Sequence, residues 1–342
     1  MITLSDIHAA RARLQGITTR TRLIEFKPEV PHACPEPSRR VSPSLRDLGT
    51  LTDPSRRLFL KLENHQPIGA FKLRGAYNKI ASLSEQDRKR GVISYSSGNH
   101  AQGVAYAARA LGVKAVIVMP NNAPTIKREA TTALGAEIVL VGPGSSERQL
   151  KAEELAAQYG YVIVPPYNDE KIIAGQGTIG LEILEDLPEV EAVFAPVGGG
   201  GLISGVAAAI KLTKPEVQVI GVEPELASDA QASLRAGKIV QFPADQVSRT
   251  IADGLRTQSV GSINFDHMQC FVDAIITVTE DEIHQTVKLL SANPDTVAEP
   301  SGAVATAGFL FRSDQLPKTN LNVAIISGGN IEPKMLEDLR QR

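Results

Sequence analysis

Short apolar segments alternate with helix-like segments along most of the chain after residue 57, and no other feature constrains the fold as strongly. The apolar segments are rich in Val, Ile and Leu, as in LFLKLE, GVISYS, KAVIVMP and AEIVLVG. The segments between them, such as HAQGVAYAARALG, repeat apolar residues at helical spacing. This alternation is typical of parallel sheets covered by helices on both faces, and 342 residues suffice for two lobes. We therefore expect an α/β fold with two lobes.

The segment 28–57 interrupts the alternation. It is rich in proline and arginine, it lacks apolar periodicity, and Pro-Ser-Arg-Arg occurs in it twice, at 37–40 and 54–57. A segment with so little apolar surface cannot order itself by burial, so we expect an irregular surface insertion that is dispensable for chemistry. A basic docking patch is the alternative, but the segment has no aromatic anchor and its charge is diluted by proline.

Composition and charge exclude several classes of protein. The net charge is −2, aromatic residues make up 4% and Trp is absent, which argues against a nucleic-acid-binding surface. Cys34 and Cys270 form neither a disulfide framework nor a zinc site, and a reducing, cytoplasmic setting fits them best. No apolar run is long enough to cross a membrane, and residues 1–14 indicate an amphipathic helix capped by Ser5 rather than a signal peptide. We therefore expect neither a nucleic acid nor a membrane as a partner.

Three segments rich in glycine or serine follow predicted strands, at 96–100, 198–201 and 327–330. Ligands of parallel α/β folds bind at the carboxyl ends of strands, where these segments are expected to lie. In APVGGGGLISG, four glycines precede a helix expected to open at Leu202, so backbone N–H groups and the helix dipole can converge on a phosphate. A tight turn would need only one or two glycines. Because no Gly-Lys-Ser/Thr follows, we expect a phosphate site other than an NTPase P-loop.

Lys72, Asn99 and His100 are further candidates for chemistry. Lys72 is expected at the opening of a helix, where the positive helix end disfavours the ammonium form and suits a Schiff-base amine, although most lysines are simply solvated. In SSGNH, backbone N–H groups would suit a carboxylate and Asn99 offers a side-chain amide, but helix capping explains the segment equally well. His100 by itself more often packs or caps than catalyses. The sequence GQGTIG at 175–180 matches a dinucleotide motif, but it follows a helical segment and is expected to pack within a helix.

Taken together, these segments resemble the fold-type II pyridoxal-phosphate (PLP) enzymes, and specifically the family of threonine/serine dehydratases and serine racemases. KLENHQPIGAFKLRGA, SSGNHAQGVA, IAGQGTIGLEIL, PVGGGGLISG, VEPELASD, TIADGLR, EPSGA and SGGN follow in that family's order between Leu58 and Asn330. The resemblance implies a fold like that of the tryptophan synthase β chain, with two lobes of parallel-rich sheets flanked by helices. It implies that 1–80 with 167–342 form a large PLP-binding domain, that 81–166 form a small domain, and that the chain assembles as a homodimer or homotetramer.

The same resemblance implies roles for individual residues. Lys72 would carry the cofactor and act as the base, Phe71 would pack near the cofactor ring, and Ser327 would face the pyridine nitrogen. Asn99 would donate a hydrogen bond to the phenolic oxygen of the cofactor. The residues implied to cradle the cofactor phosphate are Gly198, Gly199, Gly200, Gly201 and Leu202. The residues implied to bind the substrate carboxylate are Ser96, Asn99 and His100.

A divalent-cation site found in part of the family is matched by Glu223, the carbonyl of Ala227, and Asp229. Such oxygen ligands suit Mg²⁺, Ca²⁺ or Mn²⁺. A solvated acidic loop is the alternative reading of these residues.

The activity implied is the conversion of a small β-hydroxy amino acid, threonine or serine, to a 2-keto acid and ammonia. Three alternatives stay open. One is serine racemase, because Ser97 lies where racemases of this family carry an acid/base on the opposite face of the substrate. Another is a dehydratase of a bulkier substrate such as hydroxyaspartate or phenylserine. The last is a PLP-binding protein without catalysis, against which the presence of Lys72 and Asn99 argues.

Overall fold

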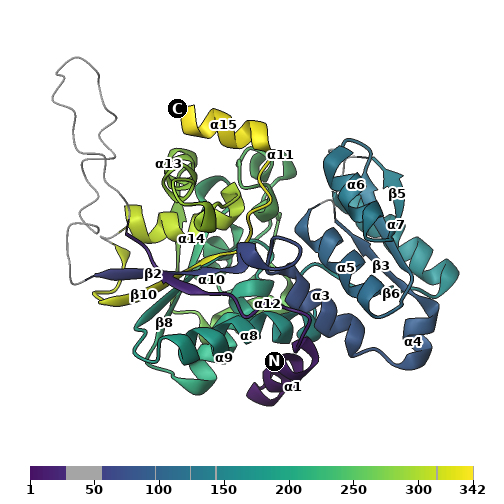
Figure 1. The fold of residues 1–342 in the computed structure, drawn as a ribbon, viewed down its shortest axis with the longest axis horizontal. Coiled ribbons are helices and arrows are strands. Elements are labelled where there is room, and N and C mark those ends of the chain that lie inside the picture. The colour runs from purple at the N-terminus through teal and green to yellow at the C-terminus, as the bar shows by residue number, and fades with distance from the viewer. Residues whose placement is uncertain (28–55, 97, 124, 143–144, 313–314, 342) are drawn as a thin grey trace.

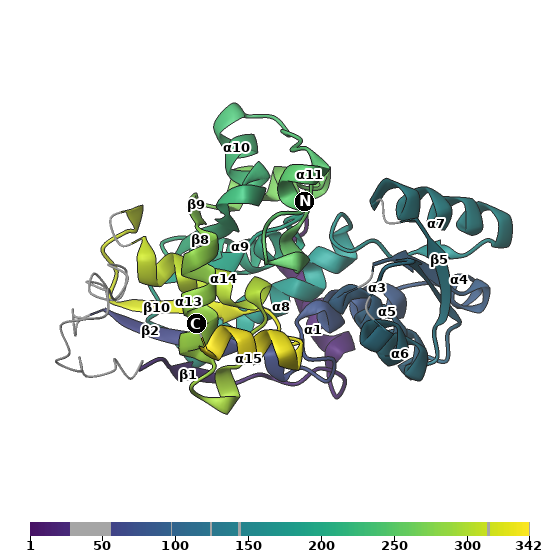
Figure 2. The same cartoon turned by 90° about the horizontal axis from the view of Figure 1, so that it is seen from above.

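The computed structural model describes residues 1–27, 56–96, 98–123, 125–142, 145–312 and 315–341. Its strands form two separate sheets, each flanked by helices, and the two lobes lie side by side in both views (Figure 1; Figure 2). The predicted α/β fold with two lobes is therefore confirmed.

The insertion predicted at 28–57 lies outside the described residues except for its last two positions. Arg57, at the end of the predicted insertion, already belongs to strand β2.

The larger sheet has the strand order β1-β2-β10-β7-β8-β9. Strands β2, β10, β7, β8 and β9 pair in parallel, while the short edge strand β1 runs antiparallel to β2. The strand bounds are β1 Leu23–Glu25, β2 Arg57–Leu62, β7 Ala192–Pro196, β8 Gln218–Pro224, β9 Ala274–Val278 and β10 Leu321–Ile326. The central strands read as continuous apolar runs because both of their faces are covered.

Successive side chains of these strands enter two different helical layers. Phe194 packs in one apolar cluster with helices α13, α14 and α15, whereas Val193 and Ala195 pack in another with α8, α9 and α12. The period of two along the strand thus sorts neighbouring residues to opposite faces. The helix bounds are α1 Leu4–Leu14, α8 Glu170–Asp186, α9 Gly201–Thr213, α10 Asp229–Ala236, α11 Ala244–Val247, α12 Ser262–Phe271, α13 Glu280–Leu290, α14 Pro300–Phe311 and α15 Pro333–Gln341.

The smaller sheet has the order β5-β4-β3-β6, and all of its pairs are parallel. Its strands are β3 Val92–Tyr95, β4 Ala115–Pro120, β5 Glu137–Val141 and β6 Val162–Ile163, and the accompanying helices are α4 Glu85–Arg90, α5 Asn99–Ala110, α6 Thr125–Ala133 and α7 Ser145–Tyr159. Helix α3 (Lys72–Ala81) packs on both α5 and α8, so it joins the two lobes. The predicted domain boundaries at 80/81 and 166/167 stay a prediction.

Two local expectations about helix starts are wrong. Helix α1 is capped by Thr3 rather than Ser5: the Thr3 hydroxyl accepts from the Asp6 N–H while the Asp6 carboxylate accepts from the Thr3 N–H, which is a capping box. Helix α9 begins at Gly201, one residue before Leu202.

The motif GQGTIG lies inside α8, as expected of helix packing. Among the described residues, no helix is long and apolar enough to span a membrane.

Candidate active site

A cavity of about 410 Å³ contains nearly all of the residues that the sequence singled out. Its lining includes the candidate residues Phe71, Lys72, Ser96, Asn99, His100, Gly198, Gly199, Gly200, Gly201, Leu202 and Ser327. These residues follow strands β3, β7 and β10 or begin helices α3, α5 and α9, so the cavity lies at the carboxyl ends of both sheets. Ser97 lies outside the described residues, and Glu223, Ala227 and Asp229 do not line the cavity.

Lys72 is the first residue of α3, as predicted. Its Nζ donates to the carbonyl oxygen of Pro166 at 2.8 Å and lies 5.1 Å from the centre of the Phe71 ring. Burial lowers the pKa of Lys72 to about 8. The neutral amine, which is the nucleophilic and basic form, is therefore easier to reach near neutral pH than in an exposed lysine.

The glycine loop closes the cavity after β7. Gly200 has φ +92°, a left-handed conformation that side chains rarely adopt. A Cβ on Gly199 would lie 2.3 Å from the ring of Tyr167, so the loop has no room for a side chain there. The N–H groups of this turn and of the first turn of α9 are thus left accessible at a positive helix end, which suits a phosphate.

Asn99 and His100 begin helix α5 at the cavity wall. Asn99 Nδ2 donates to Glu299 Oε1 at 2.6 Å, and Asn99 Oδ1 accepts from Asn330 Nδ2 at 2.8 Å. His100 is buried with Nε2 3.1 Å from the Val164 carbonyl oxygen. Burial, followed by the charge of Lys72, lowers the pKa of His100 to about 3, so its ring is neutral. The single N–H of the neutral ring donates to the Val164 carbonyl, which leaves the backbone N–H of His100 as its donor toward an anion.

Ser327 and Ser96 lie on opposite sides of the cavity, Ser327 on the lobe of the larger sheet and Ser96 on the lobe of the smaller sheet. Ser327 is buried directly after β10, and its carbonyl oxygen accepts from the Phe71 N–H at 3.0 Å, which ties the end of that strand to the residue before Lys72. Ser96 follows β3, and its hydroxyl accepts from the Gly98 N–H at 3.3 Å. A neutral hydroxyl and a serine-rich turn thus line the two sides of the cavity.

The sequence reasoning missed several residues of the cavity wall. Tyr167 covers the glycine loop, and burial raises the pKa of its hydroxyl to about 12. Glu299 contacts Asn99, and Lys127 of α6 forms an ion pair with Asp253 at 2.9 Å across the lobes. Glu299 lies in EPSGA and Asp253 in TIADGLR, two motifs that were recognised without a role for these residues. Lys127 carries no motif of its own that could have identified it.

Glu223 and Asp229 form a separate buried pair beside α10. Glu223 Oε1 and Oε2 accept from the backbone N–H groups of Ala230 and Gln231 at 2.9 and 2.8 Å. Both carboxylate oxygens of Asp229 are buried without a hydrogen-bond partner among the described residues. Burial raises the pKa of Asp229 to about 7, and burial together with the Asp229 charge raises the pKa of Glu223 well above its usual range. Two buried carboxylates, of which Asp229 lacks a hydrogen-bond partner, have the chemistry of ligands for a hard cation.

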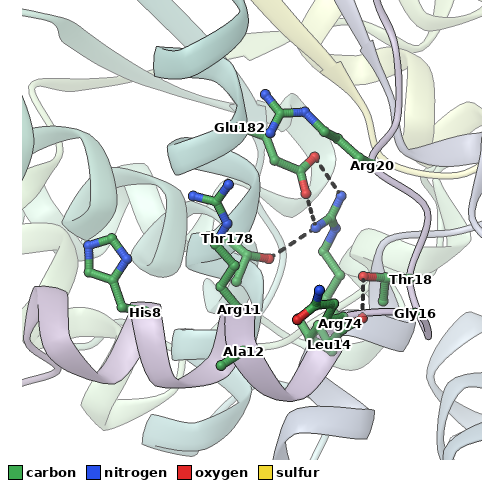
Figure 3. Close-up of a pocket in the computed structure, with 11 residues that line it drawn as sticks. His8, Arg11, Ala12, Leu14, Gly16, Thr18, Arg20, Arg74, Thr178 and Glu182 are labelled. Atoms are coloured by element: carbon green, nitrogen blue, oxygen red, sulfur yellow. Dashed lines mark hydrogen bonds and ion pairs between the residues drawn. The ribbon is translucent and has the colours of Figure 1, made fainter.

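A second cavity, of about 490 Å³, lies between α1 and α8 (Figure 3). At its floor the guanidinium of Arg74 bonds Thr178 and both oxygens of Glu182. Arg74 also holds both oxygens of Glu63 at 2.8 Å, so its donors are fully used. Every charge at this floor has a partner, and no candidate residue of the sequence analysis lies there.

Comparisons with known proteins agree with this geometry. Residues 42–328 match the model of a family described as pyridoxal-phosphate dependent enzymes. The L-threonine ammonia-lyase of Thermotoga maritima is 44% identical over 338 residues, which are 98% of this chain and 78% of that protein. The L-threo-3-hydroxyaspartate ammonia-lyase of Saccharomyces cerevisiae is 41% identical, covering 81% of this chain and 84% of that protein. The structure of maize serine racemase superposes with a TM-score of 0.86 at 33% identity, covering 98% of this chain and 96% of the other.

Proposed function

The chain belongs to the family of pyridoxal-phosphate dependent enzymes, and we propose that it is a threonine/serine ammonia-lyase in which Lys72 carries the cofactor. The observation that carries the proposal is the position of Lys72, whose pKa is lowered to about 8, in one cavity with a glycine loop suited to phosphate. Relatives that are named for their action on threonine are similar to this chain over most of its length. They support the substrate class, a small β-hydroxy amino acid.

The residues present fit the cofactor at both ends. The loop Gly198–Gly201 with Leu202 offers N–H groups to the phosphate, and Lys72 offers an amine to the aldehyde. Phe71 lies beside Lys72 and would pack against the ring, and Ser327 offers a neutral hydroxyl at the buried end of the cavity. When bound, the cofactor supplies an electron sink for cleavage of bonds at the substrate α-carbon.

The chain's own residues then divide the remaining work. Lys72, whose amine would hold the cofactor, would take the α-proton of the substrate as the base. Ser96, Asn99 and the neutral His100 bind and orient the substrate carboxylate through N–H and hydroxyl donors at the start of α5. Asn99 would also donate a hydrogen bond to the phenolic oxygen of the cofactor. Loss of the β-hydroxyl as water, followed by hydrolysis, yields the keto acid and ammonia.

A substrate panel tests this function. Purified protein loaded with PLP is assayed with L-threonine, L-serine, L-threo-3-hydroxyaspartate and phenylserine, with ketoacid and chiral amino acid detection. We expect ketoacid from L-threonine or L-serine as the main product. A clear preference for hydroxyaspartate would move the assignment to the bulkier substrates, and absence of ketoacid from all four would contradict the proposal.

Serine racemase is the second candidate, supported by the similarity to maize serine racemase and by Ser97. Racemisation needs a second acid/base on the face opposite Lys72, and a serine hydroxyl is a weak base unless it is activated. We therefore expect at most minor D-serine from the wild-type enzyme. Ser97→Ala should abolish D-serine formation while dehydration of L-substrates largely survives. D-serine as the main product, or a variant that still racemises, would reverse this ranking.

We also propose that Glu223, the Ala227 carbonyl and Asp229 bind Mg²⁺, Ca²⁺ or Mn²⁺. The unpartnered, buried carboxylate of Asp229 supports the proposal, because such a group is costly without a cation. A cation that binds only the folded state should raise the free energy of unfolding by about 2–3 kcal/mol at a hundredfold excess over its dissociation constant. A chelator should lower the melting temperature of the wild type, and each cation should restore it. Asp229→Asn should show no chelator effect, and an equal effect in both proteins would rule the site out.

The remaining proposals concern organisation. The resemblance supports a homodimer or homotetramer, which light scattering of the purified protein would test. It also supports the division into 1–80 with 167–342 and 81–166. The presence of only two cysteines supports a cytoplasmic location.

A further inference from the structure

Glu299 is a buried carboxyl group in the cavity wall for which the proposed mechanism has no use. It stands at the N-cap of α14, with 6% of its surface exposed. Its Oε1 accepts from Asn99 Nδ2 at 2.6 Å, the short distance of a hydrogen bond to a charged group. Asn99 is the residue expected to donate to the cofactor, so Glu299 is one hydrogen bond away from it.

Asn99 is held on its other side by a second chain of hydrogen bonds. Asn330 Nδ2 donates both to Asn99 Oδ1 at 2.8 Å and to the carbonyl oxygen of Ile68 at 2.9 Å. The Ile68 carbonyl only accepts, so it fixes the amide of Asn330, which in turn fixes the oxygen side of Asn99. If the Asn99 amide were flipped, its NH₂ would face the NH₂ of Asn330, and its oxygen would face the Glu299 carboxylate.

Neighbouring glycines let these side chains pack closely against the backbone. A Cβ on Gly328 would lie 2.5 Å from Glu299 Oε1, and a Cβ on Gly69 would lie 2.3 Å from Asn330 Oδ1. The backbone N–H of Glu299 donates to the Gly328 carbonyl oxygen at 3.1 Å, which holds the start of α14 against the same loop. The network is therefore packed as well as hydrogen-bonded.

On the basis of the proposed function, we infer that Glu299 is a positioning residue that fixes the Asn99 amide so that its second N–H points into the cavity as a donor. A glutamine would fill the same volume without the cost of burying a charge. It would also carry an NH₂ group, however, which could accommodate the flipped amide. Only the carboxylate, which accepts and never donates, specifies one orientation.

The charges around Glu299 link this role to pH. Burial and then Asp253 raise the pKa of Glu299 to about 7, and Asn99 and Lys127 act in the opposite direction. As Glu299 loses its proton through neutral pH it becomes acceptor-only, so the orientation of Asn99 is enforced more strongly at pH 8 than at pH 6.

A double-mutant cycle on the bound cofactor tests the inference. The dissociation constant for PLP and the visible absorption of bound PLP are measured for wild type, Glu299→Gln, Asn99→Ala and the double variant. We expect Glu299→Gln to weaken PLP binding about tenfold at pH 8, the size of one hydrogen bond to a charged group, with a smaller effect at pH 6. In the Asn99→Ala background the same substitution should have no further effect, because Glu299 acts through Asn99. In the Glu299→Gln single variant, kcat should fall by a larger factor than KM changes.

A matched control is Glu282→Gln, which removes a hydrogen-bonded carboxylate of α13 that does not line the cavity and should leave PLP binding unchanged. If Glu299→Gln does not fold, Asn330→Ala removes the other restraint on Asn99 and enters the same cycle with the same expected result. An effect of either substitution that persists in the Asn99→Ala background would overturn the inference, as would unchanged PLP binding at pH 8. PLP binding needs no turnover, so failure of the wild type to release ketoacid would reject the proposed function and leave this test intact.

Discussion

Charged side chains are buried in two regions of the large lobe, and the two regions balance those charges differently. At the floor of the cavity between α1 and α8, Arg74 binds Glu63 and Glu182, and Lys61 forms a further ion pair with Glu182 at 2.8 Å. Burial alone would raise the pKa of Glu63, but the charge and hydrogen bonds of Arg74 outweigh burial and lower it. In and near the other cavity, by contrast, the pKa of Lys72 is lowered, while the pKa values of Glu299 and Asp229 are raised.

The difference indicates that the Arg74 cluster stabilises the fold, whereas the other region contains groups used in binding or catalysis. Where every buried charge has a partner within the chain, removing one partner damages the fold, and a ligand has nothing left to complete. Where buried ionisable groups lack such partners, the chain keeps them at a cost to stability, which is typical of groups used in binding or catalysis. The following predictions test this contrast, from the largest effect to the smallest.

Lys72→Ala should lower the ketoacid-forming activity about 10⁴-fold or more, because in the proposed mechanism this one side chain both carries the cofactor and acts as the base. The melting temperature of the cofactor-free protein should not fall, since no ion pair is lost. The measurements are a ketoacid assay and thermal melting. Lys89→Ala, on an exposed lysine paired with Glu85, is the control and should retain full activity. Full activity in Lys72→Ala would break the assignment of the site.

Arg74→Met should reduce stability and leave PLP binding intact, the reverse of the effect expected for Lys72→Ala. It leaves Glu63 and Glu182 buried without their main partner, and it should lower the free energy of unfolding by about 3–5 kcal/mol. Denaturant unfolding measures this loss. Any folded fraction should bind PLP with wild-type affinity, because Arg74 does not line the cavity proposed to hold PLP. A stable variant that fails to bind PLP would mean that the two regions are not separate.

The pH dependence of stability should distinguish the regions most finely. The folded-state pKa values of Glu299 and Asp229 lie above their unfolded values, so between about pH 4 and 7 the folded state holds protons that the unfolded state has released. Their stabilising contribution is complete below the unfolded pKa and is lost as the pH rises through about 7. Without cation and cofactor, Glu299→Gln with Asp229→Asn should therefore melt about 5 °C higher than wild type at pH 8, with little difference near pH 4. A difference in melting temperature that does not change with pH would contradict this account.

Much of the architecture could be predicted from the pattern of apolar residues. Strands such as β4 and β7 are apolar throughout because both of their faces are covered, and this pattern can be seen in the sequence without the structure. The position of Lys72 at a helix start and the glycine loop before α9 were also predictable. The cap of α1 was not predicted, because serine is a better N-cap than threonine by propensity, and only the side-chain contact with Asp6 favours Thr3 over Ser5.

The sequence by itself determined the apolar strands after residue 57, the place of the glycine loop and which lysine stands at the opening of a helix, because these depend on local periodicity and backbone freedom. The tertiary structure alone decided which groups share a cavity. Asn99 is hydrogen-bonded to Glu299 and Asn330, which are 200 and 231 residues away in the sequence. Lys72 is hydrogen-bonded to the Pro166 carbonyl, 94 residues away. The pKa values that give these groups their chemistry depend on burial and on such distant partners, and both exist only once the two lobes have packed together.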